Sequence, residues 1–90
     1  MTELERELQS IFDKRKKEYQ AVYISSVGLH EAKADNARNF DRINNEFVDE
    51  IIASANEYIG KNPSVSQAEA EENIKKLIPK FSRLMISPYD

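Results

Sequence analysis

This chain lacks cysteine and tryptophan, and it has only two glycines, three prolines and one histidine among its 90 residues. Without cysteine there is no disulfide scaffold, no thiolate ligand for zinc and no thiol nucleophile. Gly28 and Gly60 are too far apart to form a glycine-rich phosphate loop. No apolar stretch approaches the length of a membrane span, and no apolar block follows a basic N-terminus as in a signal peptide. We therefore expect a cytoplasmic protein that does not enter a membrane.

The charge balance is mildly acidic. Thirteen Lys and Arg residues face sixteen Asp and Glu residues, which gives a net charge of −3. A protein built chiefly to coat nucleic acid needs a basic surface, so this balance disfavours that function and leaves a local basic patch open. The length fits one domain, residues 1–90.

The scarcity of Gly and Pro, with abundant Glu, Lys, Ala, Leu and Ile, favours helix over strand. The pattern predicts helices over about residues 3–28, 35–59 and 66–86, followed by a short tail at 87–90. Thr2 with Glu5, and Ser66 with Glu69, have the spacing of capping boxes. Asp35 is the expected N-cap of the middle helix, and Gly60 the residue just past its end.

Each predicted helix carries one apolar stripe at steps of three and four residues. Arg15 occupies a position in the first stripe where another apolar residue is due. The three stripes consist of Leu4, Leu8, Ile11, Tyr19, Val22 and Ser26; of Phe40, Ile43, Phe47, Ile51, Ala55 and Tyr58; and of Ala70, Ile74, Leu77, Phe81 and Leu84. Such stripes are buried only against one another or a partner, so we expect an all-α, antiparallel three-helix bundle. The count rises to four helices if Gly28 or Pro79 breaks its helix, although the unbroken apolar register favours a kink at Pro79.

Residues that could support catalysis or bind a metal are few. Glu46, Asp49 and Glu50 share one helix face, but no Glu-x-x-His pair accompanies them, so we interpret them as solvated acids. The only histidine, His30, stands in an expected connection between helices, without a recognisable nucleophile beside it. We therefore expect a non-enzymatic protein with no metal and no cofactor.

The basic block Lys14–Lys17 is the most distinctive local feature of the sequence. Four consecutive cations spread over about 300° of a helix, so they cannot all face one partner. Asp13 with Lys17, and Lys14 with Glu18, have the i, i+4 spacing of ion pairs, which favours a solvated and partly self-paired face. The functional alternative is contact with an acidic protein surface or a phosphate backbone.

Two tyrosines follow this block one helical turn apart. Tyrosine and arginine are frequent anchors of protein interfaces. We therefore predict a partner-binding patch on the first helix, made of Lys14, Arg15, Lys16, Lys17, Tyr19 and Tyr23. The alternative interpretation places both tyrosines at the edge of the core with their hydroxyls in water.

The sequence thus predicts a small helical protein that acts by binding another macromolecule, most simply a protein, as an inhibitor, immunity or adaptor protein does. The first helix has apolar residues on more than one face, which leaves a homo-oligomer open. The alternative is a nucleic-acid-binding regulator that uses the basic block of the first helix.

Overall fold

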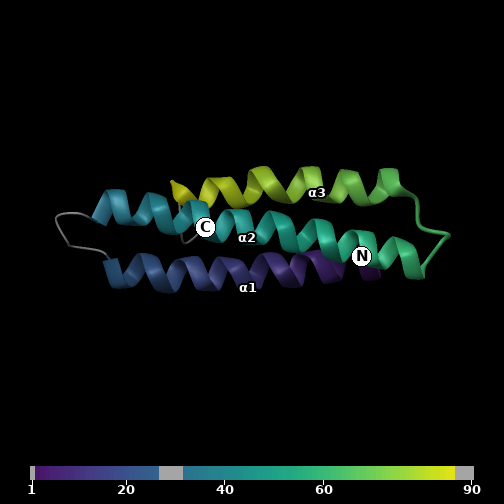
Figure 1. Cartoon of the computed structure of the whole chain (residues 1–90), viewed down its shortest axis with the longest axis horizontal. Coiled ribbons are helices and arrows are strands. Elements are labelled where there is room, and N and C mark those ends of the chain that lie inside the picture. The colour runs from purple at the N-terminus through teal and green to yellow at the C-terminus, as the bar shows by residue number, and fades with distance from the viewer. Residues whose placement is uncertain (1, 27–31, 87–90) are drawn as a thin grey trace.

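Three α-helices form the computed structural model, which describes residues 2–26 and 32–86. Helix α1 spans Glu3–Ser26, α2 spans Ala32–Lys61, and α3 spans Gln67–Ser82, with the short 3-10 helix η1 (Arg83–Met85) directly after it. Successive helices run in opposite directions and pack side by side (Figure 1). No strand occurs in the described residues. The predicted all-α, antiparallel three-helix bundle is confirmed.

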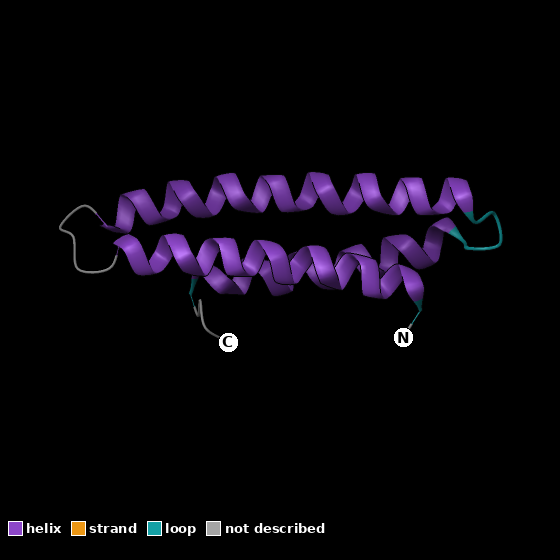
Figure 2. Cartoon of the chain, turned by 90° about the horizontal axis from the view of Figure 1, so that it is seen from below, coloured by secondary structure: helices purple, strands orange, loops and turns teal. Residues whose placement is uncertain are grey.

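The third helix is much shorter than the other two. It has 16 residues, against 24 in α1 and 30 in α2. At a rise of about 1.5 Å per residue, α3 covers roughly half the length of α2. Figure 2 shows the α1–α2 pair extending beyond α3 at one end of an elongated molecule that measures 52 × 20 × 16 Å.

Side-chain caps fix the starts of α1 and α3 as the sequence predicts. The Glu5 amide donates to Thr2 Oγ1 at 3.2 Å, and the Glu69 amide donates to Ser66 Oγ at 3.1 Å. Ser66 has the extended backbone typical of an N-cap (φ −78°, ψ 145°). Each hydroxyl therefore satisfies an amide that has no carbonyl partner within its helix.

The predicted ends of the middle helix were wrong on both sides. Asp35 is not its N-cap, because α2 already begins at Ala32. Gly60 does not follow the helix, because α2 runs to Lys61 and the Gly60 backbone lies outside the left-handed region. At this end the Tyr58 carbonyl accepts from both the backbone N–H of Asn62 at 2.9 Å and the side-chain amide of Asn62 at 3.0 Å.

Pro79 lies inside α3, which continues through it to Ser82. The helix predicted over residues 66–86 is therefore α3 followed by η1. Pro79 stands three residues before the end of α3, so the hydrogen bond that its nitrogen cannot make and the crowding of its ring against the Lys75 carbonyl affect only the last turn. The prediction about Gly28 lies outside the described residues.

The core is a cluster of aromatic rings to which all three helices contribute. Phe81 of α3 stacks on Phe47 of α2 at 4.4 Å between ring centroids, with the planes 13° apart. Phe12 of α1 meets both rings edge-on, at 5.6 Å from Phe81 and 5.8 Å from Phe47. Phe12 is 3% exposed, so it belongs to the buried stripe from which the sequence interpretation had left it out. Aromatic pairs in these geometries stabilise a core beyond the area they bury.

Candidate functional site

The basic block of α1 does not act as one unit, because Arg15 turns toward α2. Its guanidinium lies 2.8 Å from Glu50 Oε1, 2.9 Å from Glu46 Oε2 and 2.9 Å from Glu18 Oε2. Only 19% of the Arg15 side chain is exposed. The apolar position that Arg15 occupies in the stripe of α1 is therefore the centre of an ion-pair network between α1 and α2.

Two further cations complete this network. Lys14 Nζ lies 2.7 Å from Glu50 Oε2, so it pairs across to α2 and not with Glu18 as its spacing had suggested. Arg42 reaches both Glu18 and Glu46 at 3.4 Å. Three cations thus face three carboxylates, which leaves little net charge on this side of the bundle.

The network shifts the titration of its own members. The hydrogen bond from Lys14 lowers the pKa of Glu50, partial burial opposes this, and the hydrogen bond from Arg15 adds to the lowering. Burial alone would lower the pKa of Arg15, but its hydrogen bonds to Glu18 and Glu50 raise it. Both shifts favour the charged pair, as expected where opposite charges lie in hydrogen-bond contact.

The two tyrosines of the predicted patch have different positions. Tyr19 is fully buried, packs edge-on against Phe40 at 5.3 Å and donates its hydroxyl to Asn36 Oδ1 at 3.1 Å. Burial raises the pKa of the Tyr19 hydroxyl. Tyr23 is half-buried, with its ring 6.2 Å from that of Tyr19. A partner cannot reach the Tyr19 ring in this fold, so the predicted patch must be corrected at that residue.

The other two members of the basic block, Lys16 and Lys17, lie outside the Arg15 network. Lys16 is half-buried and Lys17 is exposed. Lys16 follows Phe12 by one helical turn, which places it on the side of α1 that carries Phe12. Lys80 of α3 reaches this same side, because its ammonium lies 5.2 Å from the centre of the Phe12 ring. Basic residues of α1 and α3 are therefore neighbours.

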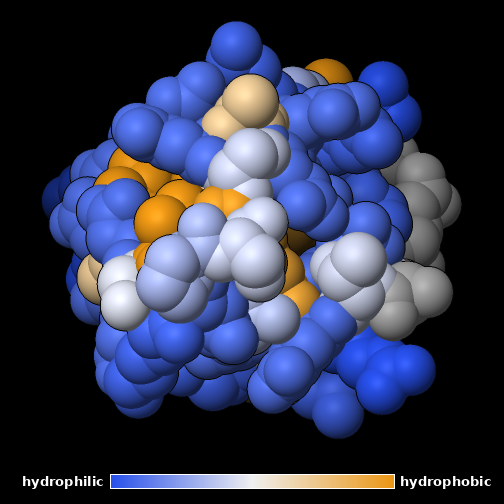
Figure 3. All heavy atoms as spheres, turned by 90° about the vertical axis from the view of Figure 1, so that its right-hand side faces the viewer, coloured by the Kyte–Doolittle hydropathy of each residue, from blue (hydrophilic) through white to orange (hydrophobic). Residues whose placement is uncertain are grey.

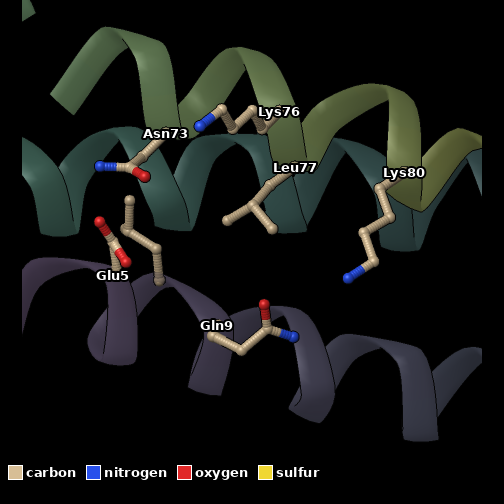
Figure 4. Close-up of a pocket in the computed structure, with 7 residues that line it drawn as sticks. Glu5, Gln9, Asn73, Lys76, Leu77 and Lys80 are labelled. Atoms are coloured by element: carbon tan, nitrogen blue, oxygen red, sulfur yellow. The ribbon is translucent and has the colours of Figure 1, made fainter. Parts of the chain in front are cut away.

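A groove of about 250 Å³ with a mixed polar and apolar lining runs between α1 and α3 beside this contact. We call it the α1–α3 groove; it is lined by Glu5, Leu8, Gln9, Asn73, Lys76, Leu77 and Lys80. Figure 4 shows Glu5 and Gln9 projecting from α1 toward Asn73, Lys76, Leu77 and Lys80 of α3. Its polar lining combines two ammonium groups with two side-chain amides, and a carboxylate stands at the end near the start of α1.

The positive charge continues beyond this groove. Arg83 follows Lys80 by about one turn of helix, and residues 75–83 contain four basic and no acidic side chains. Among the residues that the structure describes, neither Lys80 nor Arg83 has an ion pair, and Lys76 has only an exposed contact with Glu72 at 3.7 Å.

Cations near the C-terminal end of a helix are favoured by the helix dipole alone, so those of α3 do not stand out in the sequence. The signal that could have found them is the parallel course of α1 and α3, because the first and third helices of an antiparallel bundle run in the same direction. The basic middle of α1 then lies at the same level as the basic end of α3. Without that topology the two groups are about 60 residues apart and seem unrelated.

The described residues show neither a metal site nor a membrane span. Within residues 2–26 and 32–86, no group of three potential metal-ligating side chains comes together. Glu46 and Glu50 are instead held by Arg15. None of the described helices is long and apolar enough to cross a bilayer.

Comparisons with protein-family models, curated proteins and solved structures gave no match to this chain. The geometry and charge of its own side chains therefore carry the functional argument.

Proposed function

We propose that this is a non-enzymatic protein of the cytoplasm that binds an acidic segment of another protein in the α1–α3 groove. The observation that supports the proposal is the division of charge around α1. On the α2 side, cations and carboxylates are paired within the chain. On the α3 side, Lys80 and Arg83 form no ion pair with a carboxylate of the described residues, although the protein as a whole is acidic.

The composition of the groove favours a peptide over a nucleic acid. Leu77 lies between Lys76 and Lys80 along α3, and the amides of Gln9 and Asn73 complete the lining, with Glu5 near one end (Figure 4). Glu5 and the net charge of −3 oppose any anionic ligand, so the preference for a peptide comes from Leu77, which offers a contact surface to an apolar side chain. An acidic peptide can place a carboxylate near Lys76 and Lys80 and an apolar or amide group beside Leu77. The groove would then recognise a mixed acidic sequence.

The experiment compares two labelled probes, a short oligoglutamate peptide and a single-stranded DNA oligonucleotide, by fluorescence anisotropy at low and physiological salt. We expect the peptide to bind at low salt and to bind about tenfold more weakly to the variant K76Q/K80Q, because charge pairs across an interface set both affinity and rate. The matched control, K61Q/K75Q, removes two lysines that do not line this groove. Equal affinity of both variants for the peptide would contradict the proposal.

The nucleic-acid alternative remains a second proposal, supported by the neighbouring cations of α1 and α3. It predicts that the oligonucleotide binds more tightly than the peptide and that its affinity falls steeply as salt rises. Absence of oligonucleotide binding at low salt would remove it, because a site driven by phosphate contacts is strongest there.

A further inference from the structure

A second groove lies on the other side of α3, between α3 and α2. We call it the α2–α3 groove; it has a volume of about 310 Å³ and is lined by Ile52, Ala55, Asn56, Ile59, Gln67, Ala70, Glu71, Ile74 and Lys75. Its lining is more strongly apolar than that of the α1–α3 groove. Apolar side chains also reach the surface among hydrophilic ones at the end of the bundle where α2 leads into α3 (Figure 3).

Ile52 marks this groove as a surface that a partner would cover. It is 42% exposed, although it lies next to the buried face of α2 that contains Ile51 and Ala55. Ile59 and Ile74 in the same groove are half-buried. Single exposed apolar residues need no explanation, but three isoleucines that line one groove form a continuous apolar contact surface.

The charges at the rim of the groove determine what kind of partner fits. Glu71 and Lys75 stand one turn apart on α3, both are exposed, and both line the groove. Among the described residues neither has an ion pair, and Glu71 accepts only a 3.4 Å hydrogen bond from Gln67. If a second copy of the chain is turned by 180° and faces this rim, the acid of each copy lies opposite the base of the other.

We propose that the α2–α3 groove is the interface of a two-fold homodimer. In an isologous contact, a residue i that meets residue j of the second copy is matched by j meeting i. Two antiparallel α3 helices related by an axis that passes between Glu71 and Lys75 then place Glu71 of each copy beside Lys75 of the other, and the isoleucines pack between them. The proposal is independent of the proposed function, because it uses the opposite side of α3.

The first test measures mass against concentration by sedimentation or light scattering. We expect the mass to rise from the 10.4 kDa of one chain toward twice that value between about 1 μM and about 1 mM, the range in which small interfaces dissociate. I52E should remain monomeric throughout, with an unchanged circular dichroism spectrum, because its side chain is not part of the buried core. A wild-type protein that stays monomeric at the highest concentration would overturn the proposal. The proposal would also fail in this way if a different protein occupies the groove.

The second test reverses the charges at the rim. E71K alone or K75E alone places like charges opposite each other twice in a two-fold interface, so each should weaken the dimer by about tenfold or more. The double variant E71K/K75E restores both pairs with inverted sign and should return to within about threefold of the wild-type dissociation constant.

A matched control uses the next pair along the helix. Glu72 and Lys76 have the same residue types and the same spacing but do not line the α2–α3 groove. E72K and K76E make the same changes in net charge, so they separate a local contact from a general charge effect. Dimerisation that responds equally to both pairs, or that is not restored in E71K/K75E, would overturn the proposed two-fold arrangement.

Discussion

Arg15 of α1 donates two hydrogen bonds to a single carboxylate oxygen of α2: its Nη2 lies 2.8 Å and its Nε 3.1 Å from Glu50 Oε1. Glu46 and Glu18 accept from the same guanidinium. Because Arg15 replaces an apolar residue in the stripe of α1, the α1–α2 interface combines apolar packing with a charged layer. Such a layer specifies which residues of the two helices lie opposite each other.

We expect the substitution R15M to lower the free energy of unfolding by about 1–2 kcal/mol. It removes the guanidinium that lies between Glu18 and the carboxylates of α2, so these negative charges repel one another with less compensation. The value is below that of a fully buried pair because the carboxylates are partly exposed. Adding E46Q and E50Q to R15M should recover part of the loss. Urea denaturation measures these differences, and K17M, on the exposed side of α1, is the control. A stability of R15M equal to that of K17M would contradict this role for Arg15.

Stability should fall in acid partly because of Glu50. Its pKa in the folded state is lowered, chiefly by the hydrogen bond from Lys14, relative to an unfolded value of about 4.3. The carboxylate therefore stabilises the fold above about pH 4.3, and this contribution is lost as the pH falls through the folded-state pKa. Urea denaturation between neutral and acidic pH should show a smaller decline for E50Q than for the wild type. Parallel declines would show that Glu50 does not carry this effect.

Phe81 should be the most sensitive position of α3, because its buried ring contacts aromatic rings of both other helices. We expect F81A to cost about 3–5 kcal/mol and F81L less, since leucine fills more of the cavity. The exposed Met85 provides the control, with M85A changing stability little. Chemical denaturation followed by circular dichroism measures all three variants. Similar losses for F81A and M85A would contradict the central position of Phe81.

G60A should raise the free energy of unfolding by about 0.4–1 kcal/mol. Gly60 lies inside the last turn of α2, its backbone is outside the left-handed region, and a Cβ atom built there meets nothing within 4 Å. Alanine restricts the unfolded chain and has the higher helix propensity. Thermal or urea unfolding measures the gain. A loss of stability would instead support the left-handed helix end that the sequence had suggested for Gly60.

Local patterns in the sequence were enough to predict the class of fold and most of the core, although Phe12 was left out of it. The repeating apolar positions, the rarity of helix breakers and the two capping boxes are local properties, and helices at 3–26 and 67–82 follow from them closely. Phe40, Phe47 and Phe81 could be assigned to the core because spacing along one helix decides which face they share. The ends of α2 could not be predicted as well, because the preference of Asp and Gly for helix ends is worth only about 1 kcal/mol and does not confine them there.

Only the tertiary structure decided what the charged residues do. Arg15 and Tyr19 looked like candidates for an exposed patch. The packing of α2 against α1 instead places Arg15 among carboxylates and buries Tyr19. The same packing brings Lys80 to Phe12 and so joins two basic segments that are distant in sequence. The interaction of a charge depends on the sign and distance of the other charges within a few ångströms, and between helices those distances are set by the fold. Periodicity therefore determined the bundle, and packing determined which of its faces carry net charge.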